Sequence, residues 1–267
     1  MSKKNIHDQY YTKDDIAIEC IGIFIKIIPE HNRIMVIEPS AGEGAFYKNY
    51  VGVKRGIDID PKCPEIEKGN FLDYTLLDFV NSQEETAILG NPPFGFSCSL
   101  AIKFFNHASL LANVIAFIVP KTFKKASIHK KLATNFHIIH EHDLPKNSFL
   151  LDGKEYDVPC CFQIWKKAEH YRSQKVIENE FLEFVKKKDA TDKTFCVRRA
   201  GGKAGQRLDG LDHKEVSTYF VNESQPGVKA AIDKLDLSIV GCTAGVKSIS
   251  KPELLAGIKD KLNDIEI

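Results

Sequence analysis

Apolar runs of strand length alternate with segments of helical spacing through the first 165 residues of this 267-residue chain. Short apolar or β-branched runs predict seven strands, at residues 33–37, 53–59, 69–72, 86–89, 113–119, 136–140 and 158–165. Helices are predicted at residues 14–28, after a glycine-containing turn at 40–46, and at 99–112 and 124–135. This alternation predicts an α/β domain whose doubly wound, mostly parallel sheet is covered by helices on both faces. No helix separates the last two strands, so we expect an antiparallel pair at one side of the sheet, joined by a long loop at 141–157.

The pattern changes after Lys167. A charged helix is predicted at 175–188, followed by a glycine-rich basic stretch at 198–205, short strands and two helices. The last helix has a clear start signal, because Ser250 and Glu253 form a capping-box pattern with Pro252 in the first turn. We therefore expect a domain boundary near Ala168, with a catalytic domain at 1–168 and a smaller α+β domain at 169–267.

The formal net charge of +1 does not by itself indicate a nucleic-acid-binding protein. The distribution of charge is more informative, since residues 166–207 contain twelve Lys and Arg against six Asp and Glu. A local basic surface is what a phosphate backbone requires. The alternative is a solvated helix face, which we prefer for residues 186–188 taken alone.

Cysteine usage and the N-terminus indicate the cellular compartment. The seven cysteines are an odd number without a C-x-x-C pair, which predicts reduced thiols rather than a disulfide framework or a zinc site. The first 15 residues are polar and lack the apolar region of a signal peptide. The longest apolar stretch, residues 16–28, is too short to span a bilayer and contains Glu19 and Lys26. We expect a soluble, cytoplasmic protein without a membrane partner.

The first predicted strand leads into a loop with small residues that suit close approach of a ligand. The glycine spacing fits the start of a dinucleotide-binding fingerprint, but Tyr47 stands at its third small position. A carboxylate at Glu38 would repel a pyrophosphate and suits a cationic ammonium group, such as that of S-adenosylmethionine. The candidate cofactor-binding residues in this loop are Glu38, Pro39, Ser40, Ala41, Gly42 and Gly44.

The next two predicted strands supply further candidate cofactor contacts. Asp58 ends the second strand, where an acid can accept hydrogen bonds from both ribose hydroxyls, and Ile59 can pack on an adenine. Asp60 is the alternative acid, or caps the following turn. Asn70 and Phe71 can bind the adenine amino group and ring, while the alternative is a turn asparagine beside a core phenylalanine.

Asn91-Pro92-Pro93-Phe94 follows a buried apolar strand and is the most informative segment of the chain. Two prolines end the strand and stiffen the backbone at its carboxyl edge, where ligands bind in open α/β sheets. An amide and an aromatic ring are thereby placed at the mouth of a site. Four residues alone do not exclude an ordinary Asx-Pro turn with a core phenylalanine.

Taken together, these segments resemble the N6-adenine DNA methyltransferases of restriction-modification type. Tyr10-Tyr11-Thr12 before residues 15–17 is similar to the family's N-terminal cofactor motif, residues 38–46 to its methionine-binding loop, and residues 58–60 to its ribose-binding turn. Residues 91–94 are similar to its catalytic motif, and the order is that of the gamma arrangement. The resemblance spans residues 9–165 and departs at Lys13, where the family often has proline, and at Phe94, which replaces tyrosine.

The resemblance implies a class I methyltransferase fold and S-adenosylmethionine as cofactor, with Tyr11 and Thr12 among its contacts. It assigns catalysis to Asn91, Pro92, Pro93 and Phe94. The Asn91 side-chain oxygen and the Pro92 carbonyl would accept the amino hydrogens of a flipped adenine stacked on Phe94. Phe149 is our candidate for a second ring contact. Direct transfer to the amino nitrogen needs neither a metal nor a covalent enzyme intermediate.

The resemblance also places target recognition in the C-terminal domain. Arg198, Arg199, Lys203 and Arg207 lie among glycines, which permits close approach to phosphates. Double-stranded DNA is the expected partner and a cognate restriction endonuclease a potential one. The alternative substrates are adenine in RNA, the N4 of cytosine in DNA and a glutamine side chain of a protein. A non-catalytic nucleic-acid-binding module is a further alternative. A nicotinamide-dependent oxidoreductase is disfavoured by Glu38 and Tyr47, and the oligomeric state stays open.

Overall fold

The structure is a computed structural model that describes residues 10–79, 85–173, 179–237, 240 and 246–264. The chain divides into two compact units. The first comprises Met1–Phe123 and Ile128–Ser173, and the second comprises Lys124–Ser127 and Gln174–Ile267. The main division falls between Ser173 and Gln174, and the short segment Lys124–Ser127 is grouped with the second unit. Among the described residues, no helix is long and apolar enough to cross a membrane.

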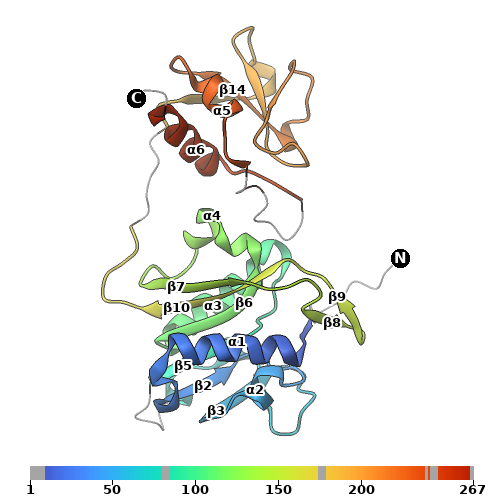
Figure 1. Ribbon diagram of the computed structural model, residues 1–267, viewed down its shortest axis with the longest axis vertical. Helices are drawn as coiled ribbons and strands as arrows, with labels where there is room; N and C mark the ends of the chain where they lie inside the picture. The colour runs from blue at the N-terminus through green and yellow to red at the C-terminus, as the bar shows by residue number, and fades with distance from the viewer. Residues whose placement is uncertain (1–9, 80–84, 174–178, 238–239, 241–245, 265–267) are drawn as a thin grey trace. The chain divides into compact units, whose positions relative to one another are not determined.

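The first unit contains a seven-stranded sheet in the order β4-β3-β2-β5-β6-β10-β7 (Figure 1). Its strands are β2 (Ile34–Glu38), β3 (Lys54–Asp58), β4 (Glu67–Lys68), β5 (Glu85–Gly90), β6 (Val114–Pro120), β7 (Phe136–Asp143) and β10 (Cys160–Lys167). The neighbouring strands β4, β3, β2, β5 and β6 all pair in parallel, whereas β10 runs antiparallel to both β6 and β7. This is the Rossmann-like fold of class I methyltransferases, and it confirms the predicted doubly wound sheet with an antiparallel pair at one side.

Alternate residues of the central strands enter two separate hydrophobic layers, which explains why these strands are apolar throughout. Val36 and Leu89 pack in the layer that contains α1 (Asp14–Ile27), and Ile37 and Ile88 pack in the layer that contains α3 (Ser99–Leu111). Both helices match their predicted ranges closely. The short helix α2 (Ala45–Asn49) follows the glycine-containing turn, with Gly44 in a left-handed conformation at its N-cap.

Three predictions for residues 1–168 were wrong. Residues 69–72 are not a strand, because Asn70 accepts a hydrogen bond from the Leu72 amide and starts a 3₁₀ turn (Phe71–Asp73); the strand next to β3 is Glu67–Lys68. The predicted helix at 124–135 shrinks to α4 (Ala126–His129), preceded by a 3₁₀ turn at Lys121–Lys124.

The third correction concerns the predicted loop at 141–157, which contains a hairpin of β8 (Phe149–Leu151) and β9 (Lys154–Tyr156). Its two-residue turn is Asp152-Gly153, with φ of +51° and +72°. An Asp-Gly pair is a strong signal for such a turn, so this hairpin was readable from the sequence. Strand β8 also pairs antiparallel with β1 (Tyr11–Thr12), which ties the N-terminal motif to the hairpin.

The second unit has a four-stranded antiparallel sheet in the order β11-β14-β12-β13. These strands are β11 (Leu182–Val185), β12 (Phe195–Arg198), β13 (Arg207–Leu208) and β14 (Thr218–Glu223), and the helices are α5 (Val228–Asp233) and α6 (Lys251–Asn263). The capping box of α6 is confirmed, since Ser250 and Glu253 bond reciprocally. The segment Lys124–Ser127 is grouped with this unit, and the buried ammonium of Lys125 lies 3.5 Å from the Glu253 carboxylate.

The predicted charged helix at 175–188 was wrong where the structure describes it. Residues 182–185 form β11, which pairs along its whole length with residues 220–223 of β14, and a 3₁₀ turn follows at Lys187–Asp189. Lys and Glu favour helices in isolation, but pairing with a neighbouring strand overrides this local preference. Residues 175–178 of that prediction lie outside the described residues.

Candidate active site

A cavity of about 1040 Å³ lies at the carboxyl ends of β2, β3 and β5 in the first unit. This edge of an open α/β sheet is where ligands bind, and the volume suits a nucleoside-sized ligand with room for a second group. The structure brings the predicted catalytic motif and the predicted cofactor-binding residues, except Gly44, together in its wall. The lining includes Tyr11, Thr12, Glu38, Pro39, Ser40, Ala41, Gly42, Asp58, Ile59, Asn70, Phe71, Asn91, Pro92, Pro93 and Phe94.

Several lining residues were missed by sequence reasoning. Phe96 lies two positions after the predicted catalytic motif, whereas Leu100 and Phe104 belong to α3 and come to the cavity only because that helix covers the sheet beside it. Adjacency to a motif was a usable signal for Phe96. Nothing in the local pattern distinguishes Leu100 and Phe104 from other apolar residues of a helix.

The loop after β2 is held in place by contacts to its backbone. Gly42 has φ of +50°, and a Cβ added there would lie 3.0 Å from the ring of Tyr11. Its amide donates to Asp58 Oδ2 at 2.7 Å, which joins the loop to the end of β3. Glycine is therefore required here both for the left-handed backbone and for close approach of β1.

Glu38 is a buried carboxylate in the cavity wall, with a relative exposure of 4%. Its Oε2 accepts a hydrogen bond from the Tyr47 amide at 2.7 Å. Burial raises the pKa of Glu38 to about 8, against the opposing effect of the backbone amides of Tyr47 and Phe46. A cationic group in the cavity would favour the ionised carboxylate and so offset the cost of its burial.

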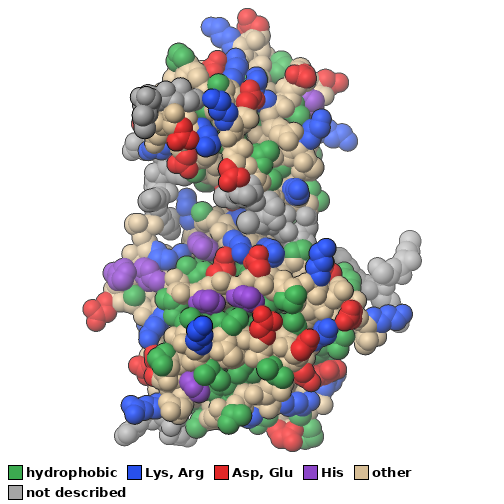
Figure 2. Space-filling model, viewed as in Figure 1, with side chains coloured by type: hydrophobic (Ala, Val, Ile, Leu, Met, Phe, Trp, Pro, Cys, Tyr) green, Lys and Arg blue, Asp and Glu red, His purple; other side chains and the backbone are tan. Residues whose placement is uncertain are grey.

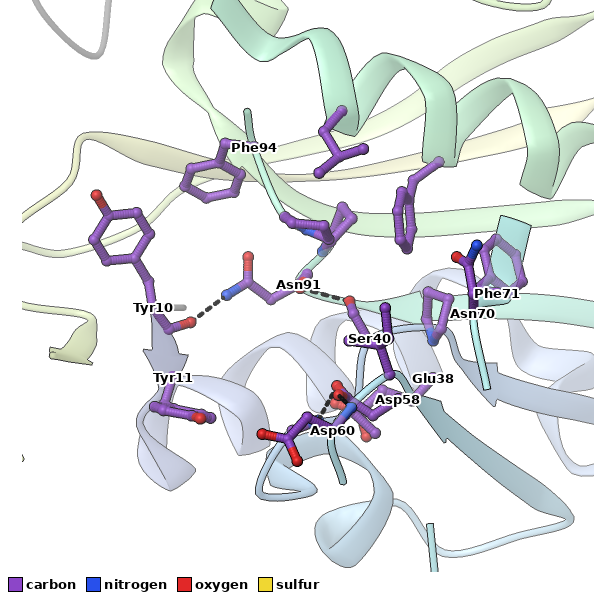
Figure 3. A pocket seen from close by; sticks show the side chains of 18 of the residues that line it. Tyr10, Tyr11, Glu38, Ser40, Asp58, Asp60, Asn70, Phe71, Asn91 and Phe94 are labelled. Carbon is purple, nitrogen blue, oxygen red and sulfur yellow. Dashed lines mark hydrogen bonds between the residues drawn. The ribbon is translucent and has the colours of Figure 1, made fainter. Parts of the chain in front are cut away.

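Asp58 connects two loops at the end of β3. Besides the bond from Gly42, its Oδ1 accepts from the Asp60 amide at 2.8 Å, as Figure 3 shows from within the cavity. These two bonds set the orientation of the carboxylate, and each oxygen keeps a lone pair for a ligand hydroxyl. Asp60, the alternative acid, is ion-paired with Lys62.

The structure gives Asn70 and Phe71 local roles as well as a place in the wall. Asn70 Oδ1 accepts from the Leu72 amide at 3.2 Å, and Phe71 is buried, with its ring stacked on Phe104 at 5.5 Å. These contacts are those of the alternative, a turn asparagine beside a core phenylalanine. Ile59 is different, because 60% of its surface is exposed at the cavity.

Asn91 is held on both sides. Its Nδ2 donates to the backbone carbonyl of Tyr10 at 3.0 Å, and its own carbonyl accepts from Ser40 Oγ at 2.9 Å. The bond to Tyr10 turns the other end of the amide, Oδ1, away from Tyr10 O and toward the side of the cavity where Phe94 lies (Figure 3). Oδ1 is buried and has no hydrogen-bond partner among the described residues. Such an acceptor costs about 1–3 kcal/mol unless a ligand satisfies it.

The ring of Phe94 is packed between two other aromatic rings. Tyr10 stacks on it with centroids 6.1 Å apart and an interplanar angle of 30°, and Phe149 meets it edge-on at 6.4 Å. Phe149 is fully buried and is not part of the cavity wall, so its predicted direct contact with a base needs correction. It supports Phe94 from behind because β8 places it opposite Thr12, and of the two rings packed on Phe94 it is Tyr10 that lines the cavity.

In the second unit, the four predicted basic contacts differ in their partners. Arg207 makes a two-pronged ion pair with Asp233 at 2.5 and 2.7 Å, and Arg198 donates to Ser217 Oγ at 3.1 Å. The exposed Arg199 lies 5.9 Å from the centre of the Tyr219 ring, and Lys203 is exposed. Basic side chains on the face shown in Figure 2 are interspersed with acidic ones. Of these four residues, Arg199 and Lys203 are therefore the better placed to bind a phosphate.

Comparison with known proteins identifies similar folds only. No protein-family model matches the chain, and no curated protein matches it. Among solved structures, a proposed RNA methyltransferase from Pyrococcus horikoshii is 15% identical over 62% of this chain and 90% of its own, with a TM-score of 0.49. A proposed class I S-adenosylmethionine-dependent methyltransferase from Listeria monocytogenes is 14% identical over 64% of this chain and 65% of its own, with a TM-score of 0.47. The assignment to the class I methyltransferase fold therefore rests on the strand order and the antiparallel β10 described above.

Proposed function

We propose that this chain transfers a methyl group from S-adenosylmethionine to the exocyclic N6 of adenine in DNA. The observation that carries the proposal is the buried Oδ1 of Asn91, which has no partner among the described residues and lies beside Phe94 in a cavity that also contains Glu38 and Asp58. An amide acceptor next to an aromatic ring suits a planar base that carries an amino group. The acidic groups across the same cavity suit a cofactor with an ammonium group and ribose hydroxyls.

The residues of the cavity fit S-adenosylmethionine. Bound there, the cofactor would supply a methyl group on a sulfonium, an electrophile that needs no further activation. Glu38 would face the ammonium group, and Asp58 would accept hydrogen bonds from the ribose hydroxyls, with Ile59 beside the adenine. Thr12 supports the same assignment, since its buried Oγ1 has no partner among the described residues and is available to a polar group of the ligand.

Asn91 would act on the amino group of the substrate base. The lone pair of that nitrogen is delocalised into the ring, which makes it a poor nucleophile. A hydrogen bond from the amino group to Asn91 Oδ1, and a second to the Pro92 carbonyl, would favour a pyramidal nitrogen and stabilise the positive charge that develops during transfer. Because the Tyr10 carbonyl already holds Asn91 Nδ2, the acceptor is oriented before the substrate arrives.

Phe94 and Tyr10 would hold the base in place. A base inside a duplex has to leave the helical stack, at a cost of roughly a few kcal/mol. Stacking on an aromatic ring recovers about 1–3 kcal/mol per base. The rigid packing of Phe94 against Phe149 means that little side-chain freedom is lost when the base binds.

DNA is proposed as the substrate because a separate unit with exposed basic residues follows the catalytic unit. Arg199 and Lys203 would contact phosphates, which provides affinity and position rather than sequence recognition. An RNA substrate would use the same chemistry at Asn91, and the experiment below separates the two.

The test is methyl transfer from tritiated S-adenosylmethionine to duplex DNA, single-stranded DNA and total RNA in parallel, followed by nucleoside mass spectrometry. We expect N6-methyladenine in duplex DNA. Label in RNA alone would overturn the DNA assignment while keeping the chemistry, and N4-methylcytosine would overturn the choice of base. If the chain binds the cofactor but labels none of the three pools, the proposed function is wrong.

A further inference from the structure

Phe96 lies two residues after the Asn-Pro-Pro-Phe segment and is 92% exposed. It is the most exposed of the large apolar side chains in the described part of the chain, and it lines the cavity that contains Asn91. Phe94, by contrast, is only 7% exposed. The segment thus presents one aromatic ring inside the cavity and a second at its opening.

The backbone around Phe96 adopts an unfavourable conformation. Gly95 has φ of +69°, and the two residues after Phe96, Ser97 and Cys98, have φ of +52° and +64°. Left-handed backbone is unfavourable for residues other than glycine, and two such residues persist only where surrounding contacts impose them. Strain of this kind concentrates at functional positions.

The contacts that impose this turn come from the start of α3. The carbonyl of Phe94 accepts hydrogen bonds from the Leu100 and Ala101 amides at 3.1 and 3.2 Å, and the Cys98 amide donates to the Gly95 carbonyl at 3.2 Å. A Cβ added to Gly95 would lie 2.9 Å from the Leu100 nitrogen, so the turn closes tightly on the helix. Phe96 is therefore carried outward on a fixed backbone, not on a long loop.

We infer that Phe96 stacks on the nucleobase next to the one presented to Asn91. This inference rests on the proposed function. A base that enters the cavity takes the place beside Phe94, and its neighbour on the same strand then remains at the opening, where Phe96 lies. An exposed, preoriented ring gains stacking energy with any base, because every base has a π face. Phe96 is thus a substrate-binding residue that recognises no particular neighbour.

The test combines a protein variant with an altered substrate. The probe is the shortest oligonucleotide that the wild-type chain methylates, prepared intact and with an abasic residue on either side of the target base. Phe96→Ala should raise the KM for the intact oligonucleotide about 5-fold to 150-fold, the range that loss of one stacked base produces. On the oligonucleotide that lacks the contacted neighbour, wild type and Phe96→Ala should have the same KM, since the partner of the ring is gone.

Two further variants separate stacking from other effects. Phe96→Trp keeps a ring and should retain the wild-type KM, whereas Leu110→Ala removes another exposed apolar side chain, 71% exposed and outside the cavity, and should change nothing. The dissociation constant for S-adenosylhomocysteine should be unchanged in all three variants. Equal losses from Phe96→Ala on intact and abasic oligonucleotides would overturn the inference alone. A wild-type chain that methylates no nucleic acid would overturn the proposed function and the inference with it.

Discussion

At the residue scale, the cavity combines groups that already hold loops in place with two buried acceptors that have no partner among the described residues. Each oxygen of Asp58 accepts one hydrogen bond from a loop amide, whereas Asn91 Oδ1 and Thr12 Oγ1 accept none from the described residues. Satisfied groups hold the loops in position. A buried acceptor without a partner marks a position where a ligand gains more binding free energy. A hydrogen bond from the ligand there removes the cost of the unsatisfied acceptor as well as adding a contact.

Asn91→Ala should lower kcat about 100-fold to 1000-fold, the usual effect of removing one group that stabilises charge in the transition state. The dissociation constant for S-adenosylhomocysteine should stay near the wild-type value, because the side chain of Asn91 is assigned to the substrate base. Asn32→Ala, at an exposed position outside the cavity, is the matched control and should behave as wild type. Turnover of Asn91→Ala at the wild-type rate would contradict the assigned role.

Glu38 predicts a pH dependence of cofactor binding. Its pKa of about 8 in the free protein means that it is mostly protonated at neutral pH, whereas an ammonium ligand prefers the carboxylate. Binding should therefore release a proton, and affinity should rise by up to about tenfold per pH unit as the pH approaches 8. Above about pH 8 the carboxylate is already ionised in the free protein, and the gain should level off.

Calorimetric titration with S-adenosylhomocysteine in two buffers of different ionisation enthalpy measures this proton release directly. Glu38→Gln should bind more weakly and release no proton from this position. Identical heats in the two buffers for the wild-type protein near pH 7 would show that Glu38 does not face the ammonium group.

At the element scale, the site is a product of strand ends and the loops that follow them. Strands β2, β3 and β5 finish at the same edge of the sheet, and β1 of the N-terminal segment is brought beside them by pairing with β8. Gly42 lies where these elements meet, with Tyr11 on one side and Asp58 on the other. Substitutions in this loop should therefore weaken ligand binding in addition to lowering global stability.

Gly42→Ala and Gly153→Ala form a matched pair that tests this expectation. Both glycines have positive φ, +50° and +72°, so either alanine should cost about 1–2 kcal/mol of stability. Only at Gly42 does the new Cβ meet a neighbour, the Tyr11 ring at 3.0 Å, while nothing lies within 4 Å at Gly153. Gly42→Ala should weaken S-adenosylhomocysteine binding about tenfold, which corresponds to about 1.4 kcal/mol, and Gly153→Ala should not. If the two variants bind S-adenosylhomocysteine equally tightly, after correction for the fraction of unfolded protein, the loop does not pack closely on the ligand.

At the scale of the whole molecule, the proposed function assigns methyl transfer and phosphate contacts to different units. The first unit contains the cavity, and the second unit is an antiparallel sheet with two helices and its own core around Leu182, Val197, Val221 and Leu254. Its basic residues are not equivalent, because Arg207 is held by Asp233 while Arg199 and Lys203 are exposed.

The double variant Arg199→Ala/Lys203→Ala should weaken binding to duplex DNA and reduce the slope of log affinity against log salt by about 2, one for each phosphate that the protein no longer neutralises. Methylation at saturating DNA should be retained, since neither residue touches the cavity. Lys261→Ala removes a cation that is already paired with Asp264 and is the control. A salt slope unchanged in the double variant would remove the second unit's basic stretch from the proposed DNA-binding surface.

The hydrophobic pattern of the sequence predicted helices and strands most reliably where those elements are buried. The strands at the centre of the sheet are covered on both faces, so their apolar runs were recognisable, and so were α1 and α3 that cover them. Errors arose where local preference and tertiary pairing disagree. Residues 182–185 lie in a charged segment with helical composition but form a strand beside β14, and residues 124–135 have an amphipathic pattern but keep only one helical turn.

The sequence by itself determined the class of fold, the edge of the sheet at which the site lies, and most residues of the cavity wall, because strand-end motifs in a parallel sheet necessarily converge. The tertiary structure decided which of those side chains face the cavity and which of their polar atoms have a hydrogen-bond partner. It buried Phe149 behind Phe94, brought Tyr10 to the cavity, and left Oδ1 of Asn91 without a partner among the described residues while the Tyr10 carbonyl held Nδ2. Side-chain direction and hydrogen-bond satisfaction depend on partners far apart in the chain, such as β1 and β8, and no local pattern contains that information.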